Sequence, residues 1–120
     1  MVGLKETLSE LADRLERDGC PHMGEVRAVL ETFGDVGGRM PIVSAPSDGG
    51  VRIVFAGGGA SLRFVVQGDG DLTAHAYGQD ADGAHVIRSA TSVGFFRGVG
   101  TPSDLDEVVA FHRTLRGGHA

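Results

Sequence analysis

The chain has 120 residues, of which 41% are hydrophobic and 22% are charged, and its formal net charge at pH 7 is -5. These fractions predict a folded domain and exclude the low hydrophobicity and high charge that are typical of intrinsic disorder. The acidic balance argues against general nucleic-acid binding, which needs a clustered excess of Lys and Arg. The length predicts one domain over residues 1–120.

The cellular compartment is indicated by what the sequence lacks. A single cysteine, Cys20, cannot form an internal disulfide, which favours a reducing compartment. No apolar run has the length of a membrane span, and the N-terminal stretch lacks the basic and apolar regions of a signal peptide. We therefore expect a cytoplasmic protein without membrane contact.

The first predicted element is an amphipathic helix from Val2 to Asp18. Its leucines recur at spacings of four and three residues, which places them on one stripe. Two heptads of such a stripe are too short for an autonomous coiled coil, so packing on the chain's own sheet is favoured over a homodimer seam. The stripe consists of Leu4, Leu8, Leu11 and Leu15.

A second helix is predicted from Pro21 to Phe33. Proline is favoured at the first helical position, and apolar residues recur at helical spacing after it. Gly34 then ends the helix. The two helices form a hairpin whose apolar faces need a partner surface.

Next comes a predicted meander of antiparallel strands, preceded by a short edge strand from Met40 to Ala45. Apolar residues alternate from Val51 onwards, and a two-residue turn at Gly58-Gly59 sets the register of the first hairpin. This register places all the inward residues on one face. The predicted pairs are Phe55 with Leu62, Ile53 with Phe64, and Val51 with Val66.

The three-residue link Gly68-Asp69-Gly70 continues the same face into the next strand, which places Arg63 beside His75 on the opposite face. After Tyr77 the turn is longer, and the sequence does not fix its register. Two more strands are predicted, from Ala84 to Ser89 and from Ser92 to Arg97.

The last helix has clear start signals. Thr101 is the predicted N-cap, Pro102 the first helical residue, and Asp104 follows three residues after the cap. Gly117 ends the helix, and His112 on its apolar stripe is expected to be buried.

The predicted fold class is therefore α+β. It comprises two N-terminal helices, an antiparallel meander sheet of five or six strands, and a C-terminal helix, with the helices packed mainly on one face of the sheet.

Motifs for chemistry are weak. The Asp-Gly stretches after Asp69 and Asp80 lack the ligand spacing of a calcium loop and are typical of hairpin turns. Cys20 and His22 lie together, but a metal site needs further ligands at fixed spacing. We predict no cofactor, no metal and no catalytic residues, and an enzyme is the least favoured class.

The face opposite the core carries the candidate partner-binding residues. A mixture of Arg, His and Tyr suits an anion or a polar partner surface, although a solvated face of a one-sided sheet is the simpler interpretation. From the strand after Tyr77, either His85 or Arg88 would join this face. The candidate residues are Arg52, Arg63, His75, Tyr77 and Arg88.

These features favour a small non-enzymatic binding protein that acts through a protein partner, as an inhibitor, immunity-type or regulatory protein does. The order of elements is also similar to the helix-grip topology, although no strand precedes the first helix and the final helix is short. That resemblance implies the alternative, a carrier or sensor of a small apolar ligand. Its cavity would be lined by Ile53, Phe55, Leu62 and Phe64. Self-association as a homodimer is compatible with both.

Overall fold

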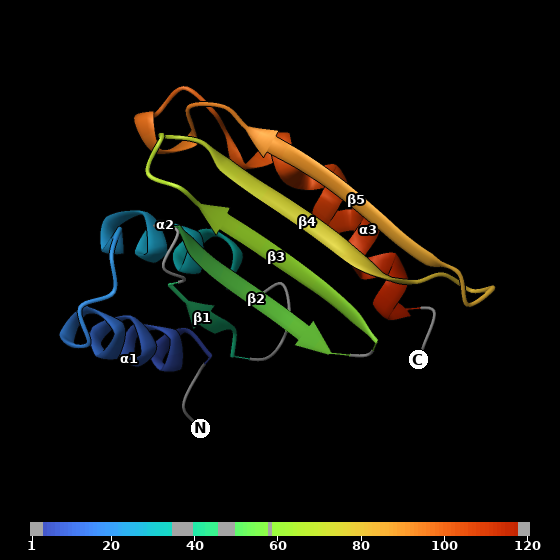
Figure 1. Ribbon diagram of the computed structural model, residues 1–120, viewed down its shortest axis with the longest axis horizontal. Helices are drawn as coiled ribbons and strands as arrows, with labels where there is room; N and C mark the ends of the chain where they lie inside the picture. The colour runs from blue at the N-terminus through green and yellow to red at the C-terminus, as the bar shows by residue number, and fades with distance from the viewer. Residues whose placement is uncertain (1–3, 35–39, 46–49, 58, 118–120) are drawn as a thin grey trace.

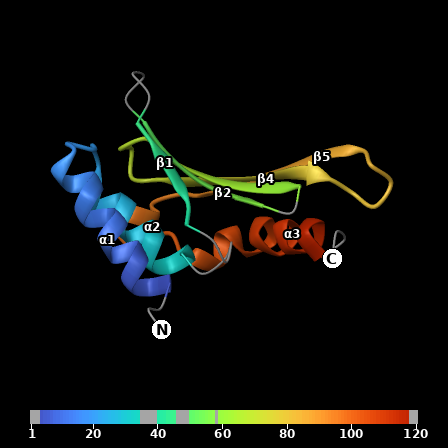
Figure 2. The ribbon, with the colours of Figure 1, turned by 90° about the horizontal axis from the view of Figure 1, so that it is seen from below.

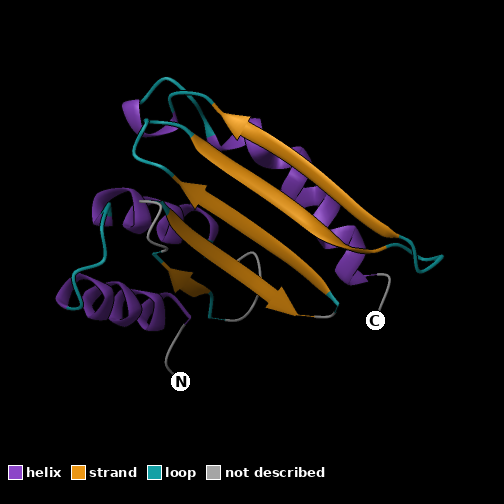
Figure 3. Cartoon of the chain, in the orientation of Figure 1, coloured by secondary structure: helices purple, strands orange, loops and turns teal. Residues whose placement is uncertain are grey.

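A computed structural model describes residues 4–34, 40–45, 50–57 and 59–117. Within them the sheet has five strands, and the predicted α+β class is confirmed (Figure 1, Figure 3). The helices are α1 (Leu4–Arg17), α2 (Met23–Phe33) and α3 (Asp106–Gly117), with short 3₁₀ turns at η1 (Phe95–Arg97) and η2 (Pro102–Leu105). The strands are β1 (Ile42–Ser44), β2 (Val51–Gly57), β3 (Ala60–Val66), β4 (Leu72–Gln79) and β5 (His85–Ser92).

The molecule has two layers. All strands pair antiparallel with their neighbours in the chain, in the order β1-β2-β3-β4-β5. Figure 2 shows α1, α2 and α3 on the same side of this sheet, while no described helix covers the other side. One face of the sheet therefore forms the core with the helices, and the other is left open.

The predicted register of β2, β3 and β4 is confirmed. Phe55 faces Leu62, Ile53 faces Phe64, and Val66 lies between Val51 and Leu72. These inward side chains are at most 1% exposed. Phe64 anchors the aromatic part of the core, because the ring of Phe33 from α2 stacks on it at 4.5 Å and the ring of Phe55 meets it edge-on at 6.1 Å.

The leucine stripe of α1 packs against other parts of the same chain. Leu8 and Leu11 are each only 6% exposed, and α1 packs against α2. His112 of α3 is fully buried, as predicted. The stripe that a homodimer seam would need is thus occupied by intramolecular contacts, at least at these two described leucines.

The predicted strand from Ser92 to Arg97 is wrong. The preceding strand instead continues to Ser92, and glycines with positive φ, Gly94 at 75° and Gly98 at 78°, then enclose the 3₁₀ turn η1. Phe95 and Phe96 therefore do not point to opposite faces of a sheet. Both rings are half-buried against the same core, 5.0 Å apart.

Smaller differences occur at two other boundaries. Helix α2 begins at Met23 rather than at Pro21, because the intervening His22 adopts a left-handed conformation with φ 56°. Strand β1 is confined to Ile42–Ser44, shorter than predicted, and follows Pro41, which cannot donate to the ladder.

The start of the last helix confirms the predicted cap and adds a link to the sheet. Asp104 Oδ2 accepts a hydrogen bond from the backbone N–H of Thr101 at 3.1 Å. The hydroxyl of Ser92, at the end of β5, lies 3.0 Å from the same carboxylate oxygen, and its side chain is fully buried. Asp104 thus joins the helix cap to the last strand.

We predict that Asp104→Ala lowers the free energy of unfolding by about 1–3 kcal/mol, because it removes the cap and one partner of a buried hydroxyl. Urea denaturation measures this change. Asp106→Ala is the matched control, since it removes an equal charge from the same helix start without contacting Ser92. Equal losses in the two variants would contradict the proposed link.

Candidate partner-binding surface

We define the open sheet face as the side chains of even-numbered residues in β1 and β2 and of odd-numbered residues in β3, β4 and β5. The strand pairing aligns these side chains in rows that cross the sheet. No described helix lies over them (Figure 2). The central row contains Ile42, Val54, Arg63, His75 and Ser89.

The structure brings most of the predicted residues together. Arg63 and His75 are direct partners on β3 and β4. Tyr77 is the next residue of β4 on this face, and Arg52 lies diagonally from Arg63 on β2. The open sheet face therefore gathers these four side chains, as their alternation in the sequence predicts.

Arg88 does not join them, which corrects its predicted placement. It pairs with the buried Ala76, so its side chain lies on the helical side of β5. There its Nη1 is 2.8 Å from Glu107 Oε1 of α3, and its guanidinium lies 4.8 Å from the centre of the Phe111 ring. The open face instead receives Ile87, Ser89 and His85 from this strand.

Arg63 occupies the centre of the open sheet face and is half-buried. Its guanidinium carbon lies 5.9 Å from the centre of the Tyr77 ring, within the range of a cation–π contact. Its Nε is shielded from solvent and has no hydrogen-bond partner among the described residues. No carboxylate of the described chain neutralises its charge.

His75 is oriented by a neighbour that the sequence did not reveal. Its Nδ1 lies 2.7 Å from Ser89 Oγ, which depends on the β4–β5 register. Partial burial lowers the pKa of His75, and the positive charge of Arg63 lowers it further. Both effects favour the neutral imidazole, and no carboxylate among the residues of the open sheet face pairs with it for acid–base catalysis.

The charge of this face contrasts with that of the whole chain. The chain contains 16 acidic residues, yet none of the strand residues that form the open sheet face is Asp or Glu. Arg52 and Arg63 are its permanent charges. The face is thus locally positive on a protein whose net charge is -5.

Apolar side chains and a hollow add contact area at its margins. Ile42 on β1 and Ile87 on β5 are each 67% exposed. Beside Ile87, a shallow hollow of about 270 Å³ is bordered by Tyr77 and His85. Exposed apolar groups beside Arg, His and Tyr are typical of surfaces that bind proteins.

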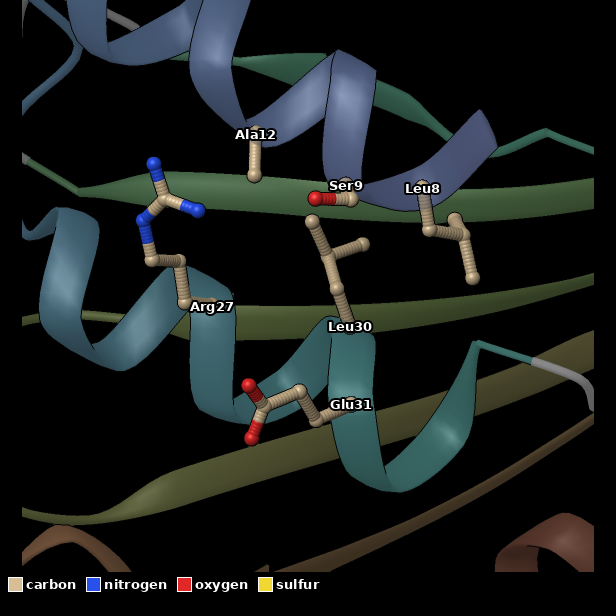
Figure 4. A pocket seen from close by; sticks show the side chains of 6 residues that line it. All are labelled: Leu8, Ser9, Ala12, Arg27, Leu30 and Glu31. Carbon is tan, nitrogen blue, oxygen red and sulfur yellow. The ribbon is translucent and has the colours of Figure 1, made fainter. Parts of the chain in front are cut away.

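A second cleft, of about 200 Å³, lies between α1 and α2 (Figure 4). Leu8, Ala12 and Leu30 form its buried part, and Arg27 stands at its edge. Arg27 forms ion pairs with Asp13 at 3.0 Å and with Glu16 at 3.1 Å, so its charge is balanced within the helical hairpin. Ser9 and Glu31 complete its lining.

The described residues offer neither a candidate metal centre nor a thiol with a lowered pKa. No group of three or more His, Cys, Asp or Glu side chains that could hold a metal ion occurs among the described residues. Burial raises the pKa of the Cys20 thiol. The Asp-rich turns cap their own backbone, because Asp80 Oδ1 accepts the N–H groups of Asp82 and Ala84.

The residues expected to line a ligand cavity fill the interior instead. Ile53, Phe55, Leu62 and Phe64 are buried in one cluster, and the Phe55 and Phe64 rings are in contact with each other. This packing gives no support to the carrier alternative.

The chain was compared with known proteins. No family model, no curated protein and no solved structure matches it. In the described part of the chain, none of the helices is both long and apolar enough to cross a bilayer.

We predict that His75 titrates below its ordinary value of 6.5 in the folded protein. Because the lowered pKa makes the folded state bind protons less readily than the unfolded state, the contribution of His75 to stability is complete above about pH 6.5 and is lost as the pH falls. NMR titration of the imidazole measures the midpoint. Arg63→Gln should raise it only partly, since burial remains, and Arg113→Gln should leave it unchanged; a wild-type midpoint at or above 6.5 would contradict the assignment.

The placement of Arg88 gives a separate prediction. Arg88→Ala should lower the free energy of unfolding by up to about 1 kcal/mol, because it removes an exposed ion pair and a ring contact on the helical side. A double-mutant cycle with Glu107→Ala in chemical denaturation measures the coupling. Fully additive losses would show that the two side chains do not interact in solution.

Proposed function

We propose that this chain is a small non-enzymatic binding protein that acts through a protein partner, as an inhibitor, an immunity-type protein or a regulatory protein does. The partner docks on the open sheet face. The observation that carries the proposal is a sheet face that no described helix covers and that concentrates Arg, His and Tyr side chains at its centre.

The dimensions of the face suit this role. Neighbouring strands are about 4.8 Å apart, so the distance from β1 to β5 is about 19 Å. Strands β3 and β4 add a length of seven and eight residues. A surface of this width accommodates one element of a partner, either a helix or an extended segment, together with its flanking side chains.

The centre of the face has the features of an energetic hot spot. Arg and Tyr are enriched among the residues that dominate protein–protein affinity, and Arg63 and Tyr77 contact each other here. The half-buried Val54 and Val65 surround Arg63. Such apolar neighbours exclude water once a partner is bound, which strengthens the polar contacts that they enclose.

The proposal predicts capture of a partner that depends on this face. The tagged wild-type protein and the triple variant Arg63→Ala/His75→Ala/Tyr77→Ala are used as baits in extracts of the native host. The triple variant should capture at least about tenfold less partner than the wild type, since truncation of each hot-spot residue costs about 2 kcal/mol or more of binding free energy. Quantitative mass spectrometry measures the captured amount.

Arg113→Ala on α3 is the control, because this exposed arginine lies on the helical layer. It should capture as much partner as the wild type. Circular dichroism and thermal melting establish that every bait is folded. A partner that is captured equally by the triple variant would remove the open sheet face from the proposed function.

A further inference from the structure

The arginines of this chain differ in how their charge is balanced. Arg27 lies 3.0 Å from Asp13, Arg88 lies 2.8 Å from Glu107, and a carboxylate is also within 4 Å of Arg97. Arg63 has no such partner among the described residues, although it is more enclosed than most surface arginines. The most central cation of the open sheet face thus lies without a counter-charge from the described residues.

The surroundings of Arg63 prepare it for a ligand. Its shielded Nε and the contact with the Tyr77 ring restrict the guanidinium, so less conformational entropy is lost when a ligand binds its terminal nitrogens. Partial burial also lowers the local dielectric constant, which strengthens a hydrogen bond to a charged acceptor. A planar carboxylate matches the fork of the guanidinium.

We propose that the partner is an acidic protein segment that places an Asp or Glu carboxylate on Arg63, with Tyr77 and His75 on either side of it. This assignment rests on the proposed function, and it adds the chemistry of the partner. The absence of Asp and Glu from the described residues of the open sheet face supplies the charge complementarity.

A protein segment fits better than a nucleic acid. Binding of a phosphate backbone draws on many Lys and Arg side chains, whereas this face carries Arg52 and Arg63 on an acidic chain. The exposed Ile87 and the hollow beside Tyr77 offer contacts to apolar side chains, which a peptide has and a phosphate backbone lacks.

His75 makes the interaction dependent on pH. The groups that face it are Arg63 on β3, Ser89 on β5 and Tyr77 on its own strand, with Arg52 one row away; none of them is acidic. In the free protein, burial and the charge of Arg63 disfavour the imidazolium of His75. A carboxylate of the partner favours it, so binding raises the pKa of His75 and takes up protons. Affinity should therefore increase as the pH falls from about 8 to about 6.

Synthetic peptides test the assignment directly. The probe is a peptide of about eight residues with blocked termini, in which every second residue is Glu and the residues between are Leu or Ser. When extended, this peptide spans about 26 Å. Its counterpart with Lys in place of Glu and a single-stranded oligothymidylate of similar length are the comparison probes. NMR spectra of the isotope-labelled full chain are recorded during each titration.

The Glu peptide should shift the amide signals of Arg63, His75 and Tyr77, bind more tightly at about pH 6 than at about pH 8, and weaken with salt. Arg63→Gln should reduce its affinity about tenfold, whereas the matched variant Arg113→Gln should not change it. The His75→Gln variant should still bind the Glu peptide at about pH 8, and its affinity should no longer depend on pH.

Three results would overturn the assignment: no shifts with the Glu peptide, equal binding of the Lys peptide, or tighter binding of the oligothymidylate. If capture from extracts still depends on the open sheet face in any of these cases, the carboxylate assignment fails and the proposed function stands. If capture is independent of this face, the proposed function fails, whatever the peptides show.

Discussion

The pairing of β2, β3 and β4 is the constraint on which the rest of the structure depends. Successive side chains of a strand point to opposite faces, so a shift of one residue in any of these strands would exchange its core side chains with its surface ones. The short glycine turns fix the pairing, and Val51, Leu62 and Ala74 then share one face without exposure. The same pairing positions Arg52, Arg63, His75 and Tyr77 on the open sheet face, because they are the alternate residues of these three strands.

The helices follow from this arrangement. In β2, β3 and β4 only one face is apolar throughout, so α2 and α3 find their partner surface there, with Phe33 stacked on Phe64 and Val108 fully buried. α1 in turn packs on α2. The hydrogen bonds among Ser92, Thr101 and Asp104 then tie the start of the last helix to the end of β5. A second layer on the open face would need a second apolar face, which the sequence does not provide.

The sequence predicts the sheet well wherever turns are short. The pairing of Arg63 with His75 could be derived, because two glycine-containing loops of defined length leave little freedom in the register. The turn after Gln79 is longer, and its register is set by Asp80, whose carboxylate bonds to backbone groups of the turn. For this reason the sequence predicts the wrong face for Arg88 and does not reveal the hydrogen bond between His75 and Ser89.

Other differences also arise from backbone conformations that residue patterns do not reveal. The left-handed His22 shortens α2, and the left-handed Gly94 and Gly98 turn a β-like run of apolar residues into η1. Alternation and propensity describe what side chains favour, whereas these residues respond to tertiary contacts such as the bond from Phe96 N–H to Gly70 O.

The shielded Nε of Arg63 has a thermodynamic consequence for the free protein. A buried donor without an acceptor costs about 1–3 kcal/mol, and a total stability of about 5–15 kcal/mol is usual for a domain. An apolar side chain at this position would avoid that cost and would extend the contacts with Val54. A chain selected for stability alone would therefore gain from losing this arginine, and its presence at the centre of the sheet lowers the stability of the free protein.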